Sequence, residues 1–210
     1  MSGFLSILLV FGIILISMVL HEIAHGVVAY VLGDETAKED GRLSLNPLVH
    51  LDPINSVFIP LVLFLLGLPV IGGAKPVPVD SRNLKWGKNG MALVALAGPM
   101  MNFLLAFLSF GAMVWSGLYR IEFWREIFMT MVSVNLGFMV FNLLPMPPLD
   151  GSRVIYVILP DKVRGWFDEL ERYGTLGVMM LLMVFSTPVG RVLSEVINQL
   201  FLFISFIILR

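Results

Sequence analysis

Five consecutive residues, His21-Glu22-Ile23-Ala24-His25, combine side chains that bind and use metal ions. If they lie on a helix, His21 and His25 are one turn apart on the same face, which suits two imidazole nitrogens binding one metal. Glu22 is offset by about 100° from His21, so its carboxylate can reach a water on the metal rather than the metal itself. The pattern therefore predicts a metal site with an adjacent general base.

A catalytic zinc ion has three protein ligands and one open position. The chain has no cysteine, and His50 lies in a polar stretch, so the third ligand is expected among the acids. Asp150 is the best candidate, because it stands on a glycine turn just after an apolar run that ends in prolines. The alternative is that Asp150 caps a helix beginning near Ser152. Two histidines and one carboxylate favour zinc over other divalent ions.

These residues belong to a strongly apolar chain of 210 residues, of which 58% are hydrophobic and 14% are charged. The mean hydropathy is +0.90, and a soluble domain carries about a quarter charged residues. We therefore expect an all-α, multi-pass membrane protein with about four to six transmembrane helices. The uncharged runs are residues 4–20, 54–74, 89–119, 127–149, 173–190 and 196–209.

The composition also excludes several classes of protein. The net charge of −1, with no basic block, offers no electrostatic surface for nucleic acid. The absence of cysteine excludes disulfides and thiolate metal sites. Residues 1–210 are expected to form a single transmembrane domain, with a core at 1–155. In residues 156–210 the sequence predicts an interfacial helix at 161–172. A hydrophobic hairpin or two short crossings, broken at Pro188, should follow it.

The first helix should span residues 3–32, and firm crossings should follow at 91–117 and 127–144. The polar stretch 34–53 resembles an extended segment, because it alternates and is closed by prolines. Residues 54–74 are ambiguous, since prolines and glycines interrupt them. They either cross the bilayer or form a re-entrant excursion that continues as an extended segment to about residue 80.

The distribution of positive charge favours the re-entrant alternative. The re-entrant alternative places eleven of the 14 Lys and Arg residues on one side of the membrane, which would be the cytoplasmic side. The metal site supports the same choice. His25 and Asp150 lie at the same depth in the membrane most easily if the first helix and the helix at 127–144 run in the same direction. This requires a single crossing between these two helices. The active site would then lie nearer the cytoplasmic side.

Two motifs of the chain together resemble those of a known protein family. H-E-x-x-H in a membrane helix, followed by N-x-x-P-x-x-x-x-D-G from Asn142 to Gly151, resembles the site-2 protease family of intramembrane zinc metalloproteases, in a short form lacking a PDZ domain. Ala97-Gly98-Pro99 with Asn102 also resembles the central helix of that family. The resemblance implies one Zn²⁺ bound by His21, His25 and Asp150. It makes Glu22 the general base and Asn142 a group that positions substrate or the oxyanion.

The implied activity is hydrolysis of peptide bonds within transmembrane segments of membrane-protein substrates at the cell membrane. Its partners would be a transmembrane-helix substrate and the lipid bilayer. The extended segment, at Gly73, Ala74, Lys75, Pro76 and Val77, could bind substrate by β-strand addition, and a purely structural loop is the alternative. The rival functions are a membrane metal-binding or transport protein and an inactive substrate-binding pseudoprotease.

Overall fold

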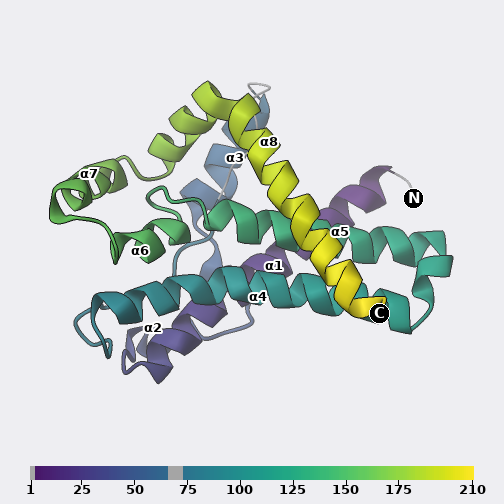
Figure 1. The fold of residues 1–210 in the computed structure, drawn as a ribbon, viewed down its shortest axis with the longest axis horizontal. Helices are drawn as coiled ribbons and strands as arrows, with labels where there is room; N and C mark the ends of the chain where they lie inside the picture. The colour runs from purple at the N-terminus through teal and green to yellow at the C-terminus, as the bar shows by residue number, and fades with distance from the viewer. Residues whose placement is uncertain (1–2, 66–72) are drawn as a thin grey trace.

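The computed structural model describes residues 3–65 and 73–210, and within these ranges the chain is helical with no β-strand. The expected all-α fold class is confirmed. The long helices are α1 (Gly3–Val31), α4 (Lys88–Trp115), α5 (Glu122–Asn142) and α8 (Gly174–Ile208). In Figure 1, α1 and α5 run in one direction and α4 runs in the opposite direction, and α4 packs against both.

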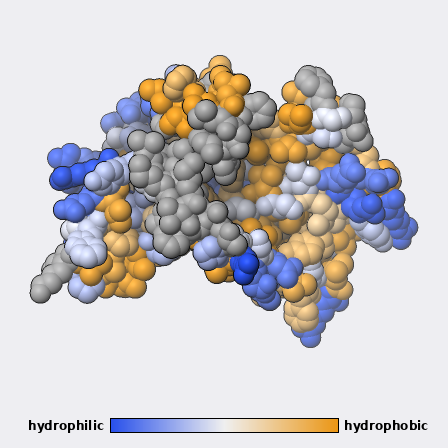
Figure 2. Space-filling view, turned by 90° about the horizontal axis from the view of Figure 1, so that it is seen from above, coloured by the Kyte–Doolittle hydropathy of each residue, from blue (hydrophilic) through white to orange (hydrophobic). Residues whose placement is uncertain are grey.

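Among the described residues, three helices are long and apolar enough to cross a membrane, at Leu5–Val31, Lys88–Trp115 and Pro188–Ile208. This is fewer than the four to six expected. The difference comes largely from α5, whose first turns carry Glu122, Arg125 and Glu126. Figure 2 shows hydrophilic residues at the left, at the right and along the lower edge of this view, with hydrophobic residues over much of the remaining coloured surface.

The core lies where α4, α5 and α8 meet. It consists of apolar side chains that are at most 9% exposed: Ala106, Phe110, Met113, Val132, Leu136, Ile204 and Ile208. Close packing of these side chains among three helices stabilises the bundle through van der Waals contacts. The short turn between α4 and α5 contains Gly117 at φ 73°, a backbone angle that glycine adopts without strain.

Helix α1 ends at Val31, within one residue of the predicted end, and Gly33 follows it with φ 105°. The stretch that follows is not the extended segment expected. It contains the short helix α2 (Thr36–Glu39) and a 3₁₀ turn at Pro47–His50. The reason is local, because the Asn46 side chain accepts a hydrogen bond from the Leu48 N–H and Pro47 occupies the first position of the turn.

The two described ends of the segment that begins near residue 54 lie together, as the re-entrant prediction requires. It begins as a π-helical turn at Pro53–Phe58 and continues as α3 (Ile59–Leu65), while residues 66–72 lie outside the described residues. The Ser56 hydroxyl donates to the Gly73 carbonyl at 2.6 Å, and the Lys75 N–H donates to the His50 carbonyl at 2.8 Å. A segment whose two ends are hydrogen-bonded together cannot cross a layer about 30 Å thick.

The C-terminal part contains α6 (Asp150–Tyr156) and α7 (Asp161–Arg172), and the predicted bounds of α7 are confirmed. An ion pair between Arg153 and Glu171 joins these two helices. In place of the two segments expected next, the structure has the single helix α8, which contains Pro188 and changes direction along its length (Figure 1). Proline removes one backbone hydrogen bond and bends a helix without ending it when flanking turns hold.

Candidate metal centre and active site

The two histidines of α1 lie on the helix face that packs against α4. His21 is 6% exposed and His25 is 8% exposed. Their Nε2 atoms are 3.0 Å apart. This is the arrangement predicted from their spacing of four residues, since one helical turn brings both rings to the same point.

Asp150 completes the group from a distant part of the sequence. Its Oδ2 atom lies 3.2 Å from Nε2 of His21 and 3.4 Å from Nε2 of His25. The predicted meeting of α1 and the chain after α5 is therefore present in the structure. Helix α6 begins at Asp150 itself and its N-cap residue is Leu149, so Asp150 lies in the first turn of this helix rather than before it.

Gly151 allows Asp150 to reach this position. A Cβ atom at residue 151 would lie 2.2 Å from the Leu143 carbonyl oxygen and 2.5 Å from that of Leu144. These are backbone atoms at the end of α5, so they cannot move aside as a side chain would. Glycine is therefore required for α6 to begin directly against the end of α5.

The hydrogen-bond partners of the two histidines indicate that the group fits a cation. Nδ1 of His25 lies 2.7 Å from the Val94 carbonyl, which only accepts, so the proton of a neutral His25 ring is on Nδ1. Nδ1 of His21 likewise donates to Oδ1 of Asn102 at 2.6 Å. Both Nε2 atoms then present lone pairs to each other and to the buried Oδ2 of Asp150, which has no hydrogen-bond donor. Three electron-rich atoms held this close repel one another, so the group fits a positive ion placed between them.

The spacing of these three atoms also suits zinc. With metal–ligand distances of about 2.0–2.2 Å, the edges of a tetrahedral site are roughly 3.3–3.6 Å. The three separations of 3.0, 3.2 and 3.4 Å are close to that edge. His21, His25 and Asp150 are the group of potential metal ligands found among the described residues.

A chain of buried amides orients His21. Nδ2 of Asn102 on α4 donates to Oδ1 of Asn135 on α5 at 2.9 Å, and Nδ2 of Asn135 donates to the Met131 carbonyl at 2.8 Å. Because the last acceptor is a carbonyl, the direction of every bond in the chain is fixed. Asn102 was noted in the sequence only as part of a family motif, and Asn135 was missed. Their signal is an amide inside an apolar membrane helix, where polar groups are costly.

Gly98 lies directly against the metal group. A Cβ atom there would be 2.5 Å from Nε2 of His25 and 2.6 Å from Nε2 of His21. The small residue therefore does more than bring two helices together, because it leaves the space in which the ligand nitrogens meet. This role depends on the register of α4 against α1.

Glu22 lies beside the metal group rather than within it, as its position on the helix predicts. Its Oε2 atom accepts a hydrogen bond of 2.9 Å from the backbone N–H of Val77. The extended segment 73–77 is thus brought to the predicted general base. This contact joins the two features that the sequence placed 55 residues apart.

The remaining candidate, Asn142, is in the last turn of α5, and its Nδ2 atom donates to the Phe138 carbonyl of its own helix at 3.1 Å. Its role towards substrate stays a prediction. His50 is fully buried, lies outside the metal group and contacts the Ser44 carbonyl through Nε2 at 2.9 Å. It holds a loop, as expected from its position.

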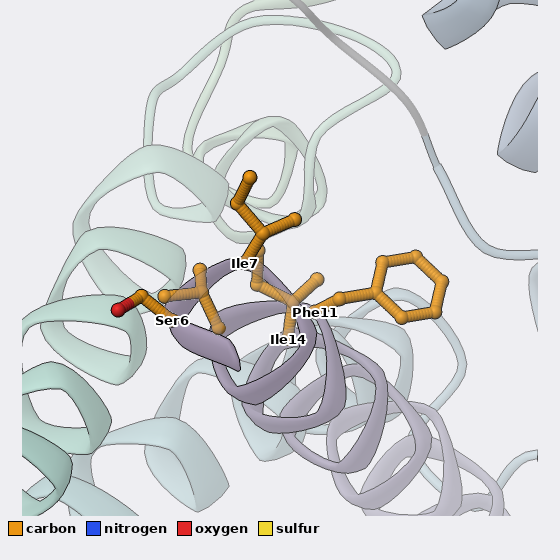
Figure 3. A pocket seen from close by; sticks show the side chains of 5 residues that line it. Ser6, Ile7, Phe11 and Ile14 are labelled. Atoms are coloured by element: carbon orange, nitrogen blue, oxygen red, sulfur yellow. The ribbon is translucent and has the colours of Figure 1, made fainter. Parts of the chain in front are cut away.

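An apolar hollow of about 370 Å³ lies on the N-terminal half of α1, away from the histidines (Figure 3). Ser6, Ile7, Val10, Phe11 and Ile14 line it. Ile7 and Phe11 are 69% and 62% exposed, which fits a surface in contact with lipid tails. It contains no group that could serve the chemistry above.

The chain is similar to curated proteins described as zinc metalloproteases. It is 39% identical over 184 residues to the Bacillus subtilis protein named "Putative zinc metalloprotease YwhC", covering 84% of this chain and 80% of that protein. It is 31% identical to the Rip2 proteins of Mycolicibacterium smegmatis and Mycobacterium tuberculosis, which carry the same description. The aligned parts cover 80% and 83% of this chain, and they span 64% and 65% of the two Rip2 proteins.

No family model matches the chain, and no solved structure matches it. The assignment therefore depends on these relatives, together with the two sequence motifs and the metal group that they form. On that combined evidence the chain belongs to the site-2 protease family, and it is a membrane protein of the zinc metalloprotease type.

Proposed function

We propose that this protein is an intramembrane metalloprotease that hydrolyses peptide bonds within transmembrane segments of membrane-protein substrates. One observation carries the proposal. His21, Glu22 and His25 lie within Leu5–Val31, the part of α1 that is long and apolar enough to span a membrane, rather than in a loop. A protease whose reacting groups are at that depth acts on peptide bonds that reach the same depth.

His21, His25 and Asp150 would hold one Zn²⁺, with Asn102 and the Val94 carbonyl fixing the two rings. When bound, zinc supplies a Lewis acid that activates water and polarises the scissile carbonyl. Glu22 takes the proton of the attacking water on its carboxylate and returns it to the leaving amide nitrogen. Asn142 donates a hydrogen bond to the carbonyl oxygen of the substrate.

The extended segment 73–77 binds the substrate backbone in this proposal. The Lys75 N–H is bound to the His50 carbonyl, Pro76 has no N–H, and the Val77 N–H is bound to Glu22. A substrate carbonyl that replaces Glu22 as the acceptor of the Val77 N–H would lie beside the carboxylate. The same exchange frees that carboxylate to accept a proton. Substrate pairing and release of the base are thereby one event.

The protein would reside in the cell membrane, with the lipid bilayer as its second partner and residues 1–210 as one transmembrane domain built on a core at 1–155. The loops before and after the re-entrant segment lie at the same end of the molecule as α6 and α7 (Figure 1). Most Lys and Arg residues are in these parts, which favours a cytoplasmic location for them. His25 is six residues from Val31, at the end of α1 near these loops, so the active site is nearer the cytoplasm.

Glu22→Gln tests the proposal directly against its rivals, a metal-binding or transport protein and an inactive pseudoprotease. Purified wild type and variant are incubated with a transmembrane substrate in the same detergent. Zinc bound equally by both, with cleavage lost by at least about a thousandfold in the variant, supports the protease. Equal cleavage by both proteins, or no cleavage by the zinc-loaded wild type on any transmembrane substrate, would overturn it.

A further inference from the structure

The extended segment beside Glu22 is held by a loop and by side chains rather than by a neighbouring strand. The Gly73 carbonyl accepts from the Ser56 hydroxyl, and the Lys75 N–H donates to the His50 carbonyl. Val77 is 8% exposed, although the segment has no sheet around it. The position of this segment therefore depends on a small number of specific contacts.

Arg42 supplies the most concentrated of these contacts. Its side chain is buried, with 6% exposure. Nη2 donates to the Lys75 carbonyl at 2.6 Å and to the Pro76 carbonyl at 3.1 Å, while Nη1 donates to the Val49 carbonyl. Burying a guanidinium among carbonyl oxygens is costly unless several hydrogen bonds compensate, so this arrangement is a specific one.

Arg42 and Glu22 hold opposite ends of one peptide group. The carbonyl of Pro76, which accepts from Arg42, and the N–H of Val77, which donates to Glu22, belong to the same planar unit. In a trans peptide these two groups point in opposite directions. The guanidinium therefore determines which way the Val77 N–H points, and it points at the general base.

We propose that Arg42 is a positioning residue that fixes the Pro76–Val77 peptide against Glu22 and so sets the edge on which substrate is bound. The inference rests on the proposed protease function, since it names the residue that prepares the substrate strand. Lysine cannot replace arginine here, because a single ammonium does not offer the planar fork that reaches three carbonyls.

A thiol placed on the segment tests this positioning without any activity measurement. The chain has no cysteine, so Val77→Cys introduces the sole thiol and keeps the backbone N–H. In this background, Arg42→Lys and Arg42→Gln should each raise the rate of maleimide labelling at least about tenfold. Arg120→Gln, at an exposed arginine in the α4–α5 turn, is the matched control and should leave the rate unchanged.

Ala106→Cys reports on the rest of the fold, because Ala106 is fully buried in the α4–α5–α8 core. Its thiol should stay protected in the Arg42 variants, which should also bind zinc as the wild type does. For a transmembrane substrate, the KM should rise about tenfold while kcat changes less, since a bound substrate still meets an intact metal site.

An unchanged labelling rate of the residue 77 thiol in the Arg42 variants would overturn the proposal. So would faster labelling of the residue 106 thiol in the same variants, because it would show that the whole fold had loosened. If the wild type cleaves a transmembrane substrate and the Arg42 variants cleave it with the same KM, the proposal is also overturned. If the wild type cleaves no transmembrane substrate, the proposed protease function fails. The labelling result then still decides whether Arg42 positions the segment.

Discussion

Nδ1 of His21 lies 2.6 Å from Oδ1 of Asn102, so a residue of α4 orients a metal ligand of α1. The bond sets the tautomer of the ring and directs the Nε2 lone pair towards His25 and Asp150. Partners of this kind hold ligand rings in place before the ion arrives.

Asn102→Ala should lower the affinity for zinc by about 10- to 100-fold, because His21 loses the acceptor that fixes its ring. Competition with a chelator of known affinity measures the change. Asn135→Ala removes the next amide of the chain and should have a smaller effect. Equal affinities in the wild type and the Asn102 variant would show that this bond does not prepare the site.

Gly98→Ala should abolish stable zinc binding, since a methyl group at that position would occupy the space in which the two Nε2 atoms meet. The expected loss of affinity is at least about a hundredfold, larger than that from removing an orienting partner. Gly137→Ala is the matched control, because a Cβ atom there meets nothing within 4 Å. Full zinc occupancy in the Gly98 variant would contradict the observed approach of α4 to the histidines.

Val77→Pro should raise the KM for a transmembrane substrate about tenfold without changing zinc content. Proline keeps the extended conformation but removes the N–H that we propose is exchanged from Glu22 to substrate. Val77→Ala keeps the N–H and serves as the control. A KM unchanged by the proline would remove segment 73–77 from substrate binding.

Asp34 should make the stability of the protein sensitive to acid. Burial alone would raise the pKa of its carboxyl, but hydrogen bonds from Thr36, from Asn83 and from the Asp80 backbone outweigh burial and lower the pKa below 3.8. A carboxyl whose pKa is lower in the folded state stabilises the fold above its unfolded pKa. That stabilisation is lost as the pH falls from about 4 through the folded pKa.

Asp34→Asn should therefore destabilise the protein by about 2 kcal/mol at pH 7, and the difference from wild type should shrink below about pH 4. Thermal unfolding in detergent at a series of pH values measures both effects. Asp40→Asn changes an exposed carboxylate of the same stretch and should alter stability by less than about 0.5 kcal/mol. A difference that grows towards low pH would have the wrong sign.

The parts of the site that follow from local periodicity were predictable. His21 and His25 meet because they are four residues apart on one helix, and Glu22 lies beside them for the same reason. Asp150 could be proposed because it follows an apolar run that ends in prolines and stands next to a glycine, and the favoured helix directions agreed with that choice. The family motif then named the same residues independently.

The parts that depend on how helices pack against each other were not predictable. The positions of Gly98 and of the Asn102–Asn135 pair are set by the rotation of α4 about its axis, which no spacing within one helix reveals. Arg42 was visible only as part of a polar stretch. Two of its three partners are carbonyls more than 30 residues away, and carbonyls have no sequence signature.

Mapping the cleaved bond tests the central claim most directly. A substrate with one transmembrane segment is reconstituted with the protein in lipid vesicles, and the products are identified by mass spectrometry beside a Glu22→Gln control. We predict new termini within the hydrophobic segment of the substrate, in its half nearer the cytoplasmic side, and none in the control. Cleavage confined to the polar residues flanking that segment would contradict it.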